Sequence, residues 1–200
     1  MNMVCLDLEG VLIPEIWIAF SEATGIRQLH RTTREEPDYD KLMNFRIDIL
    51  KENNLKLPDI QRVISGMEPL EGALEFSMAL RDKTQLVILS DTFDQFAKPM
   101  MQKLLLPCLF CNTLETAPDG TITGYRLRQP NGKKEAIRAF KSMKMRIFAA
   151  GDSYNDLAMI NEADAGCLFK APQSIREECS HLVCVDSFDE LLAQIDKFLG

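Results

Sequence analysis

The stretch RIFAAGDSYND, residues 146–156, decides the fold. Its first half is a short apolar run, which predicts a buried β-strand. Its second half begins at Gly151 and places two acidic residues, Asp152 and Asp156, four positions apart around Asn155. Ligands of open α/β sheets bind at the carboxyl ends of the strands, so polar residues directly after a buried strand indicate a functional site.

Two stretches nearer the N-terminus have the same pattern, an apolar run that ends in polar residues. They are LVILSDT at 86–92 and VCLDLEG at 4–10. The segments between the predicted strands have the apolar spacing of helices, so strands and helices alternate along the chain. This alternation predicts an α/β fold with a mostly parallel sheet that carries helices on both faces.

A helical insertion interrupts the alternation directly after the first predicted strand. Helical apolar spacing at 15–24 and 41–53 dominates this part of the chain. We therefore expect two units. Residues 1–13 and 76–200 would form the catalytic core, and residues 14–75 would form a helical cap over the site that sets substrate specificity.

Two local signals add detail to the core. Asp119-Gly120 separates extended segments at 113–116 and 121–127, which predicts a β-hairpin. Ser187, with Glu190 three residues later, predicts the capped start of the last helix.

The polar strand ends suggest phosphoryl transfer. Asp7 and Asp152 would lie at adjacent strand ends, where two carboxylates repel each other unless a cation lies between them. Oxygen ligands of this kind suit Mg²⁺. A carboxylate at Asp7 could then attack phosphorus and form a phosphoaspartate.

Neighbouring residues would complete this chemistry. Glu9 stands two positions past Asp7, so strand alternation would point both side chains the same way and let Glu9 act as general acid and base. The hydroxyl of Ser90 and the backbone N–H of Asp91 would hydrogen-bond the phosphoryl oxygens. A lysine ammonium, from the pair at 133 and 134, would stabilise the charge in the transition state.

Taken in order, these motifs resemble the haloacid dehalogenase-like phosphatase superfamily. Residues 7–11 match its first motif, Ser90 its second, a lysine at 133 or 134 its third and residues 151–156 its fourth. The resemblance spans nearly the whole chain. It implies a Rossmann-like core with a cap of the family's type-one position.

The resemblance also implies roles for individual residues. Mg²⁺ would be held by the Asp7 carboxylate, the backbone carbonyl of Glu9 and Asp152, with Asp156 behind these ligands. Lys133 is preferred over Lys134 as the third-motif lysine, because the run KKEAI at 133–137 is similar to the phosphoserine phosphatase branch.

The predicted cap resembles the same branch. There a cap acid binds the substrate ammonium and a cap arginine binds its carboxylate, and Glu15 and Arg46 match those positions; the alternative is that both are surface charges on amphipathic helices. The substrate-binding residues implied are Glu15, Arg46, Ser90, Asp91, Lys133 and Asn155.

One residue departs from the family pattern. Glu9 stands where the family usually has a second Asp, which moves the acid/base carboxyl out by one methylene. This departure is similar to members that are both phosphoserine phosphatases and phosphoserine:homoserine phosphotransferases. The resemblance thus implies transfer of phosphate from phosphoserine to water or to homoserine, in serine or threonine biosynthesis.

Other functions compete with this interpretation. The chain could be a phosphatase for another small ester, a binding protein on a silenced scaffold, or a phosphate-accepting signalling domain. The presence of the expected nucleophile at Asp7 argues against silencing, and a cap would shield that residue from a partner protein.

Composition limits the partners. The 200 residues carry a net charge of −7, and no basic run interleaves with aromatics, so nucleic acid is not expected. No apolar run approaches the roughly 18 residues of a membrane span, and no basic leader is visible, so a cytoplasmic location is expected. Small molecules are the expected partners, and a homodimer is possible.

Cys108 and Cys111 form a weak zinc motif, for which Cys179, His181 and Cys184 are conceivable partners. The stretch that contains Cys108 and Cys111 is better explained as a buried strand.

Overall fold

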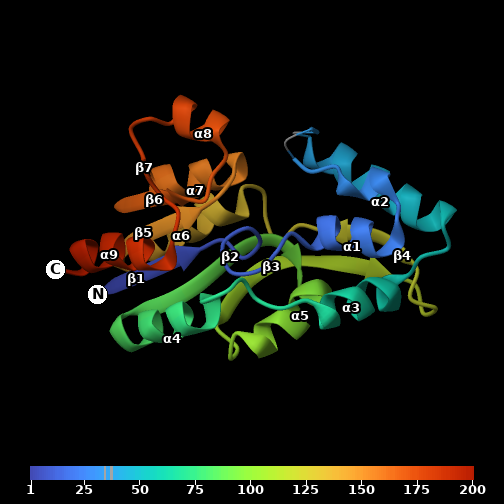
Figure 1. Ribbon diagram of the computed structural model, residues 1–200, viewed down its shortest axis with the longest axis horizontal. Coiled ribbons are helices and arrows are strands. Elements are labelled where there is room, and N and C mark those ends of the chain that lie inside the picture. The colour runs from blue at the N-terminus through green and yellow to red at the C-terminus, as the bar shows by residue number, and fades with distance from the viewer. Residues whose placement is uncertain (34, 37) are drawn as a thin grey trace.

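The computed structural model describes every residue of the chain except 34 and 37. Its centre is a seven-stranded sheet in the order β4-β3-β2-β1-β5-β6-β7, in which β4 pairs antiparallel and the other pairs are parallel (Figure 1). This confirms the predicted fold class. The strands are β1 Asn2–Leu6, β2 Gln85–Phe93, β3 Cys108–Thr116, β4 Ile122–Arg126, β5 Arg146–Gly151, β6 Ala165–Phe169 and β7 Val183–Val185.

Helices cover both faces of this sheet. The helices are α1 Ile16–Thr24, α2 Tyr39–Glu52, α3 Leu57–Gly66, α4 Ala73–Lys83, α5 Asp94–Lys103, α6 Gly132–Ser142, α7 Leu157–Glu162, α8 Gln173–Glu178 and α9 Phe188–Leu199, with short 3₁₀ turns at Arg27–His30 and Tyr154–Asp156. The short helix α8 is not apparent from the sequence pattern.

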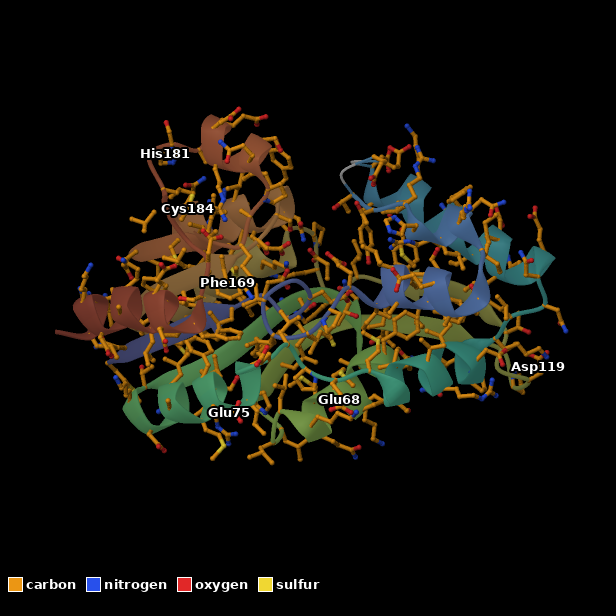
Figure 2. All side chains as sticks on the ribbon, viewed as in Figure 1. Glu68, Glu75, Asp119, Phe169, His181 and Cys184 are labelled. Atoms are coloured by element: carbon orange, nitrogen blue, oxygen red, sulfur yellow. The ribbon has the colours of Figure 1, made fainter. Side chains whose placement is uncertain are left out.

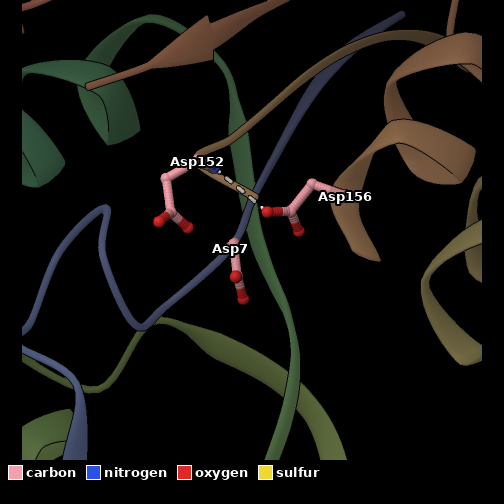
Figure 3. A group of neighbouring side chains, drawn as sticks. All are labelled: Asp7, Asp152 and Asp156. Carbon is pink, nitrogen blue, oxygen red and sulfur yellow. Dashed lines mark hydrogen bonds between the residues drawn. The ribbon is translucent and has the colours of Figure 1, made fainter. Parts of the chain in front are cut away.

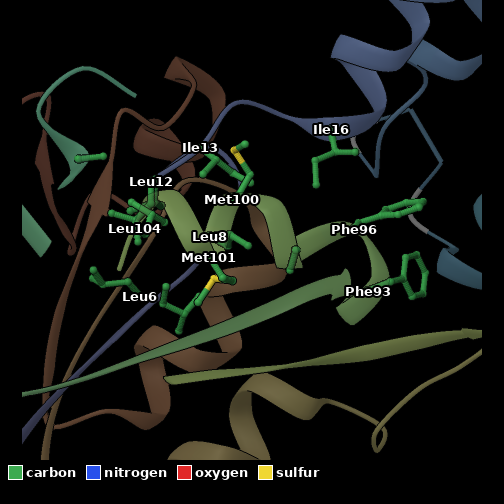
Figure 4. Packing of buried hydrophobic residues seen from close by; sticks show 14 of the residues in the cluster. Leu6, Leu8, Leu12, Ile13, Ile16, Phe93, Phe96, Met100, Met101 and Leu104 are labelled. Carbon is green, nitrogen blue, oxygen red and sulfur yellow. The ribbon is translucent and has the colours of Figure 1, made fainter. Parts of the chain in front are cut away.

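The hydrophobic core is divided by the sheet into two clusters. In β1, Val4 and Leu6 belong to one cluster and Met3 and Cys5 to the other, because successive side chains of a strand point to opposite faces. Figure 4 shows Leu6 packed in the larger cluster with residues of α5. Burial on both faces fixes the position of β1 in the centre of the sheet, and therefore the position of the loop that follows it.

The insertion after β1 leaves and rejoins the core at one place, where the N–H of Leu70 donates to the carbonyl of Leu12 at 2.9 Å. Figure 1 shows α1 and α2 on the side of the molecule where β3 and β4 extend beyond the other strands. Helix α3 packs against α5. The expected boundary between residues 75 and 76 falls inside α4, and residues 34 and 37 of the expected cap lie outside the described part of the chain.

The β-hairpin expected around Asp119-Gly120 is present as β3 and β4. Gly120 adopts a positive φ of 84°, which a glycine tolerates at no steric cost. Strand β2 differs from expectation. It continues to Phe93, and its pairing with β3 is irregular between Leu89 and Phe93, so that residues 90–92 lie in a bulge rather than beyond the end of the strand.

The cysteines show no sign of a metal site in the part of the chain that the structure describes. Cys108 is exposed and Cys111 half-buried on β3, so this strand is less buried than the sequence suggests. Figure 2 shows His181 and Cys184 beside β7, on the opposite side of the molecule from Asp119 in the hairpin turn. Within the same described ranges, no helix has the length and apolar character to cross a bilayer.

Candidate active site

Three carboxylates gather where β1 and β5 end. Asp7 directly follows β1, and its N–H donates to the carbonyl of Ala150 in β5 at 3.0 Å. Asp152 directly follows β5, and Asp156 lies one turn later (Figure 3). All three are buried, and each offers a carboxylate oxygen within 4.8 Å of the others. The parallel sheet thus brings the first and fourth motifs together as expected.

Asp156 holds the loop that carries Asp152. One of its oxygens accepts hydrogen bonds from the N–H groups of Asp152 and Ser153 at 3.0 and 3.1 Å, and from the Ser153 hydroxyl at 3.0 Å. Its carboxyl group occupies the space that a side chain on Gly151 would need, since a Cβ there would lie 2.2 Å from the carboxyl carbon. Asp156 is therefore engaged in loop structure, with little capacity left for a direct ligand.

Lys133 lies among these carboxylates. Its ammonium is 2.7 Å from Asp156, 3.0 Å from Asp7 and 3.5 Å from Asp91, and the side chain is only 5% exposed. Lys134, one residue later on α6, is instead half-buried and lies 3.8 Å from Glu162. The structure places Lys133 beside Asp7 and Lys134 outside the site.

Buried negative charge exceeds positive charge at this place. Burial raises the pKa of Asp7 well above its usual range, and the carboxylate of Asp156 raises it further against the opposing effect of Lys133. Burial lowers the pKa of Lys133, but the surrounding carboxylates outweigh it, so the pKa lies well above the ordinary value. One buried ammonium beside the three buried carboxylates of Asp7, Asp152 and Asp156 leaves an excess of negative charge that a divalent cation would balance.

The shape of the loop also fits a bound cation. Gly10 has a positive φ of 76°, and a Cβ at this position would lie 2.5 Å from the carboxyl carbon of Asp152. The Asp152 carboxylate therefore rests directly against the backbone of the loop that follows Asp7. Carboxylates and nearby backbone carbonyls are the donor set that Mg²⁺ prefers, so the residues present fit this metal.

The bulge of β2 supplies the second motif. Ser90 is 6% exposed, and its hydroxyl oxygen accepts the N–H of Thr92 at 3.2 Å. The carboxylate of Asp91 accepts a hydrogen bond from the amide of Asn155 at 2.9 Å. Residues from β2 and from the loop after β5 are thus joined beside Lys133.

Glu9 lies in the loop between β1 and α1. Its carboxylate accepts the N–H of Ile16 at 2.9 Å, which satisfies a backbone donor at the start of α1. Burial raises the pKa of Glu9. The expectation from strand alternation is wrong in its reason, because β1 ends at Leu6 and Glu9 lies in the following loop.

Arg46 is a buried residue of α2, within the insertion. Its guanidinium lies 4.5 Å from the centre of the Trp17 ring and donates to the carbonyl of Arg31 at 2.8 Å. Its Nε is the one buried side-chain nitrogen or oxygen that lacks a hydrogen-bond partner within the described residues. Burial lowers the pKa of Arg46 to about 10, although the carboxylates of Glu9 and Glu15 oppose this effect. The guanidinium remains a cation at neutral pH with an unused donor.

A single cavity of about 80 Å³ joins these groups. At the strand ends its wall contains Asp7, Ser90 and Lys133, and beside the insertion it contains Glu15 and Arg46. Every residue expected to bind substrate lies in its wall. These are Glu15, Arg46, Ser90, Asp91, Lys133 and Asn155.

Several residues of the site escape the sequence pattern. Tyr39 and Thr92 line the cavity, and Asn112 donates to the carbonyl of Asp91 from β3 at 3.1 Å. Thr92 adjoins the second motif and could have been suspected from its position. Tyr39 and Asn112 carry no signal, because their contacts are with residues distant in the sequence.

Comparison with known proteins assigns the family. The family model for haloacid dehalogenase-like hydrolases matches residues 1–164. A phosphoserine phosphatase of Pseudomonas syringae pv. tomato is 53% identical over 98% of this chain and 83% of its own length. A phosphoserine phosphatase ThrH of Pseudomonas aeruginosa is 52% identical over 98% of this chain and 96% of its own length.

Solved structures share the fold. One described as a phospho-aspartyl intermediate analogue of phosphoserine phosphatase has a TM-score of 0.80 and 21% identity, and covers 96% of this chain and 98% of its own. A substrate-bound phosphoserine phosphatase complex has a TM-score of 0.78 and 20% identity, and covers 100% of this chain and 98% of its own. The family match and the two relatives above 50% identity show that the chain is an enzyme that belongs to the haloacid dehalogenase-like hydrolase family.

Proposed function

We propose that this enzyme hydrolyses phosphoserine through a phosphoaspartate on Asp7. The observation that carries the proposal is the cavity with two ends: a buried nucleophile and lysine at one end, and a buried guanidinium with an unused donor at the other. A phosphate ester with a carboxylate would fit both ends. The names of the two relatives above 50% identity support the same substrate.

The metal in this proposal is Mg²⁺. The Asp7 carboxylate, the backbone carbonyl of Glu9 and the Asp152 carboxylate would hold it, while Asp156 keeps the loop and Lys133 in place. When bound, Mg²⁺ would offset part of the negative charge of the phosphate and of the carboxylates.

The chain's own residues would carry out two displacements at phosphorus. An oxygen of Asp7 attacks the phosphorus, the bond to the serine oxygen breaks, and Glu9 donates a proton to the leaving alkoxide. Glu9 then accepts a proton from water as that water attacks the phosphoaspartate and releases phosphate. Lys133 stabilises the charge on the transferring group in both steps.

Other groups would bind and enclose the substrate. The Ser90 hydroxyl and the Asp91 N–H would hydrogen-bond the phosphoryl oxygens, with Asn155 supporting the Asp91 side chain. Residues 14–75 would act as the cap that excludes water and reads the amino-acid end. A cytoplasmic location is part of the same proposal.

Phosphate release tests the function directly. The purified enzyme with Mg²⁺ is expected to release phosphate from phosphoserine faster than from phosphoethanolamine, which lacks the carboxylate that would meet Arg46. Removal of divalent metal with EDTA is expected to stop the reaction, and added Mg²⁺ to restore it. Equal rates on both esters would indicate a phosphatase for a different small ester, and activity that survives EDTA would contradict the metal assignment.

Arg46 is expected to read the substrate carboxylate. Arg46→Ala should lower kcat/KM for phosphoserine by roughly 10- to 150-fold, which corresponds to the loss of one charge-assisted hydrogen bond of about 1.5–3 kcal/mol. The change for p-nitrophenyl phosphate should be much smaller, because that ester has no carboxylate. Arg31→Ala is the matched control, since Arg31 belongs to the same segment but stacks on Phe45 rather than lining the cavity. An equal loss on both esters would mean that Arg46 supports structure or phosphate binding.

Transfer to homoserine is the finer part of the proposal. Homoserine keeps the ammonium and carboxylate of serine, so it could occupy the end of the cavity that contains Glu15 and Arg46 and attack the phosphoaspartate in place of water. O-phosphohomoserine should therefore appear by ³¹P NMR when enzyme, phosphoserine, Mg²⁺ and millimolar homoserine are mixed. If inorganic phosphate is the sole product, the proposed transfer to homoserine is wrong and the enzyme is a phosphatase without transferase activity.

Glu9→Asp tests why a longer acid stands at this position. The Glu9 carboxylate reaches the N–H of Ile16 in α1, and an aspartate would be too short to keep that contact in the same backbone position. A looser cap would admit more water, so the ratio of transfer to hydrolysis should fall while hydrolysis continues. An unchanged ratio would remove Glu9 from the explanation.

A further inference from the structure

The carbonyl of Asp91 accepts hydrogen bonds from two parts of the molecule. The Tyr39 hydroxyl donates to it from the cap at 3.0 Å, and the Asn112 amide donates to it from β3 at 3.1 Å. The bulge explains this arrangement. Because the pairing of β2 with β3 is interrupted between Leu89 and Phe93, Asp91 has no partner in the strand ladder, and the two side chains supply its hydrogen bonds instead.

This carbonyl belongs to the same planar peptide unit as the N–H of Thr92. That N–H donates to the Ser90 hydroxyl oxygen at 3.2 Å. Tyr39 and Asn112 therefore hold one end of the peptide, and Ser90 is bonded to the other. With one lone pair of its oxygen occupied, the Ser90 hydroxyl keeps its hydrogen for another acceptor, and the cavity that it lines also contains Asp7 and Lys133.

The two side chains that hydrogen-bond the Asp91 carbonyl are held by different parts of the molecule. Asn112 is fixed within the core, where its carbonyl oxygen accepts the N–H of Arg128 at 3.0 Å. Tyr39 is the first residue of α2 in the insertion, and its ring packs edge-on against Tyr125 of β4 at 5.7 Å. The hydroxyl of Tyr125 in turn hydrogen-bonds Asp40. The hydrogen bond from Tyr39 to the Asp91 carbonyl can therefore form only while this end of α2 packs against the hairpin of β3 and β4.

We propose that Tyr39 is a positioning residue which, by holding the Asp91–Thr92 peptide together with Asn112, orients the Ser90 hydroxyl toward the phosphoryl group. Docking of the cap and completion of the phosphate site are then one event. The inference rests on the proposed phosphoryl transfer at Asp7, and it assigns to a cap residue a role at the phosphate end of the substrate rather than at its amino-acid end.

The first test compares Tyr39→Phe with the wild type on two esters. Removing one hydrogen bond should lower kcat/KM about 3- to 10-fold for both phosphoserine and p-nitrophenyl phosphate, because both have the phosphoryl group that Ser90 would bind. Calorimetry should show orthophosphate binding weakened by a similar factor, even if neither ester is hydrolysed. Loss of activity on phosphoserine alone, or unchanged orthophosphate binding, would overturn the proposal.

A double-mutant cycle identifies the path of the effect. If Tyr39 acts through Ser90, then Tyr39→Phe should change kcat/KM by less than about twofold in a Ser90→Ala background. Asn112→Asp keeps the acceptor for Arg128 but loses the donor to Asp91, and it should show the same dependence on Ser90. Full, additive losses in the Ser90→Ala background would refute the proposed path.

Tyr125→Phe is the matched control. It removes a tyrosine hydroxyl from the same contact between α2 and the hairpin, but that hydroxyl bonds Asp40 and not Asp91. Its effect should be smaller than that of Tyr39→Phe and additive with Ser90→Ala. If Tyr125→Phe reproduces the behaviour of Tyr39→Phe, cap docking in general is responsible and the specific role of Tyr39 is wrong. If the wild-type enzyme hydrolyses neither ester, but Tyr39→Phe still binds orthophosphate more weakly than the wild type does, the proposed function is rejected and the role of Tyr39 is not.

Discussion

Asp7→Asn is expected to lower turnover of phosphoserine by at least about 10⁴-fold, because a neutral amide cannot attack phosphorus. The substitution is nearly isosteric. An asparagine oxygen could still accept the N–H of Leu8 and the ammonium of Lys133, which Asp7 accepts at 2.7 and 3.0 Å. The loss should therefore come from chemistry and not from a disturbed site.

The same substitution should leave the fold intact. Burial and the neighbouring carboxylate of Asp156 raise the pKa of Asp7, which means that the folded protein disfavours its ionised form. Replacing it by a neutral group removes that penalty, so the melting temperature measured without added metal should not fall. Asp82→Asn, an exposed change on α4, is the control for handling and expression.

Trapping locates the intermediate independently of activity. Borohydride reduces an acyl phosphate to an alcohol, so treatment of the enzyme during turnover should modify the peptide that contains Asp7, as seen by mass spectrometry. Asp7→Asn should show no such product. Substantial turnover by Asp7→Asn, or trapping at a different carboxylate, would exclude Asp7 as the nucleophile.

The sequence predicts the order of the motifs because the relevant signals are local. An apolar run followed by polar residues depends only on neighbours in the chain, and three such runs place Asp7, Ser90 and Asp152 at one edge of a parallel sheet. The choice of Lys133 over Lys134 is different. From the sequence it rests on a resemblance, whereas in the structure it follows from Lys133 being the buried lysine on the first turn of α6.

The contacts between the insertion after β1 and the rest of the chain could not be predicted in this way. The hydrogen bond from Tyr39 to Asp91 joins residues 52 positions apart, and it depends on how α2 packs against β4. The bulge in β2 has no sequence signal either. From the sequence, residues 90–93 are typical of the end of a strand followed by the start of a helix. For Glu9 only the expected reason is wrong: β1 ends at Leu6, so strand alternation does not reach Glu9, although Glu9 and Asp7 do line the same cavity.

The same limits apply to Arg46. Its position on a helix with apolar spacing allows either a surface charge or a buried one, and the pattern does not separate them. Burial follows from tertiary packing, where the ring of Trp17 and the carbonyl of Arg31 enclose the guanidinium. The unused donor at Nε, which supports a ligand carboxylate most directly, is visible only once all neighbours are in place.

Lys133→Met is expected to cause the second largest loss of activity, with kcat/KM for phosphoserine reduced about 10²- to 10³-fold. Methionine keeps an unbranched side chain of similar length but removes the charge that would stabilise the transferring phosphoryl group. Lys134→Met is the matched control one residue away. Because the half-buried Lys134 contacts Glu162 and not Asp7, its removal should change kcat/KM by less than about twofold.

Lys133→Met and Lys134→Met should also differ in stability, with Lys133→Met the less stable of the two. Lys133 is buried and faces Asp7 and Asp156, so its removal leaves uncompensated buried carboxylates and should cost about 3–5 kcal/mol of unfolding free energy without metal. Urea unfolding followed by circular dichroism would measure this cost, and rates should be expressed per folded molecule. If Lys133→Met is destabilised but retains full activity when folded, Lys133 only neutralises the carboxylates and has no part in phosphoryl transfer. If Lys134→Met shows the larger loss of activity, the assignment of the third-motif lysine is wrong.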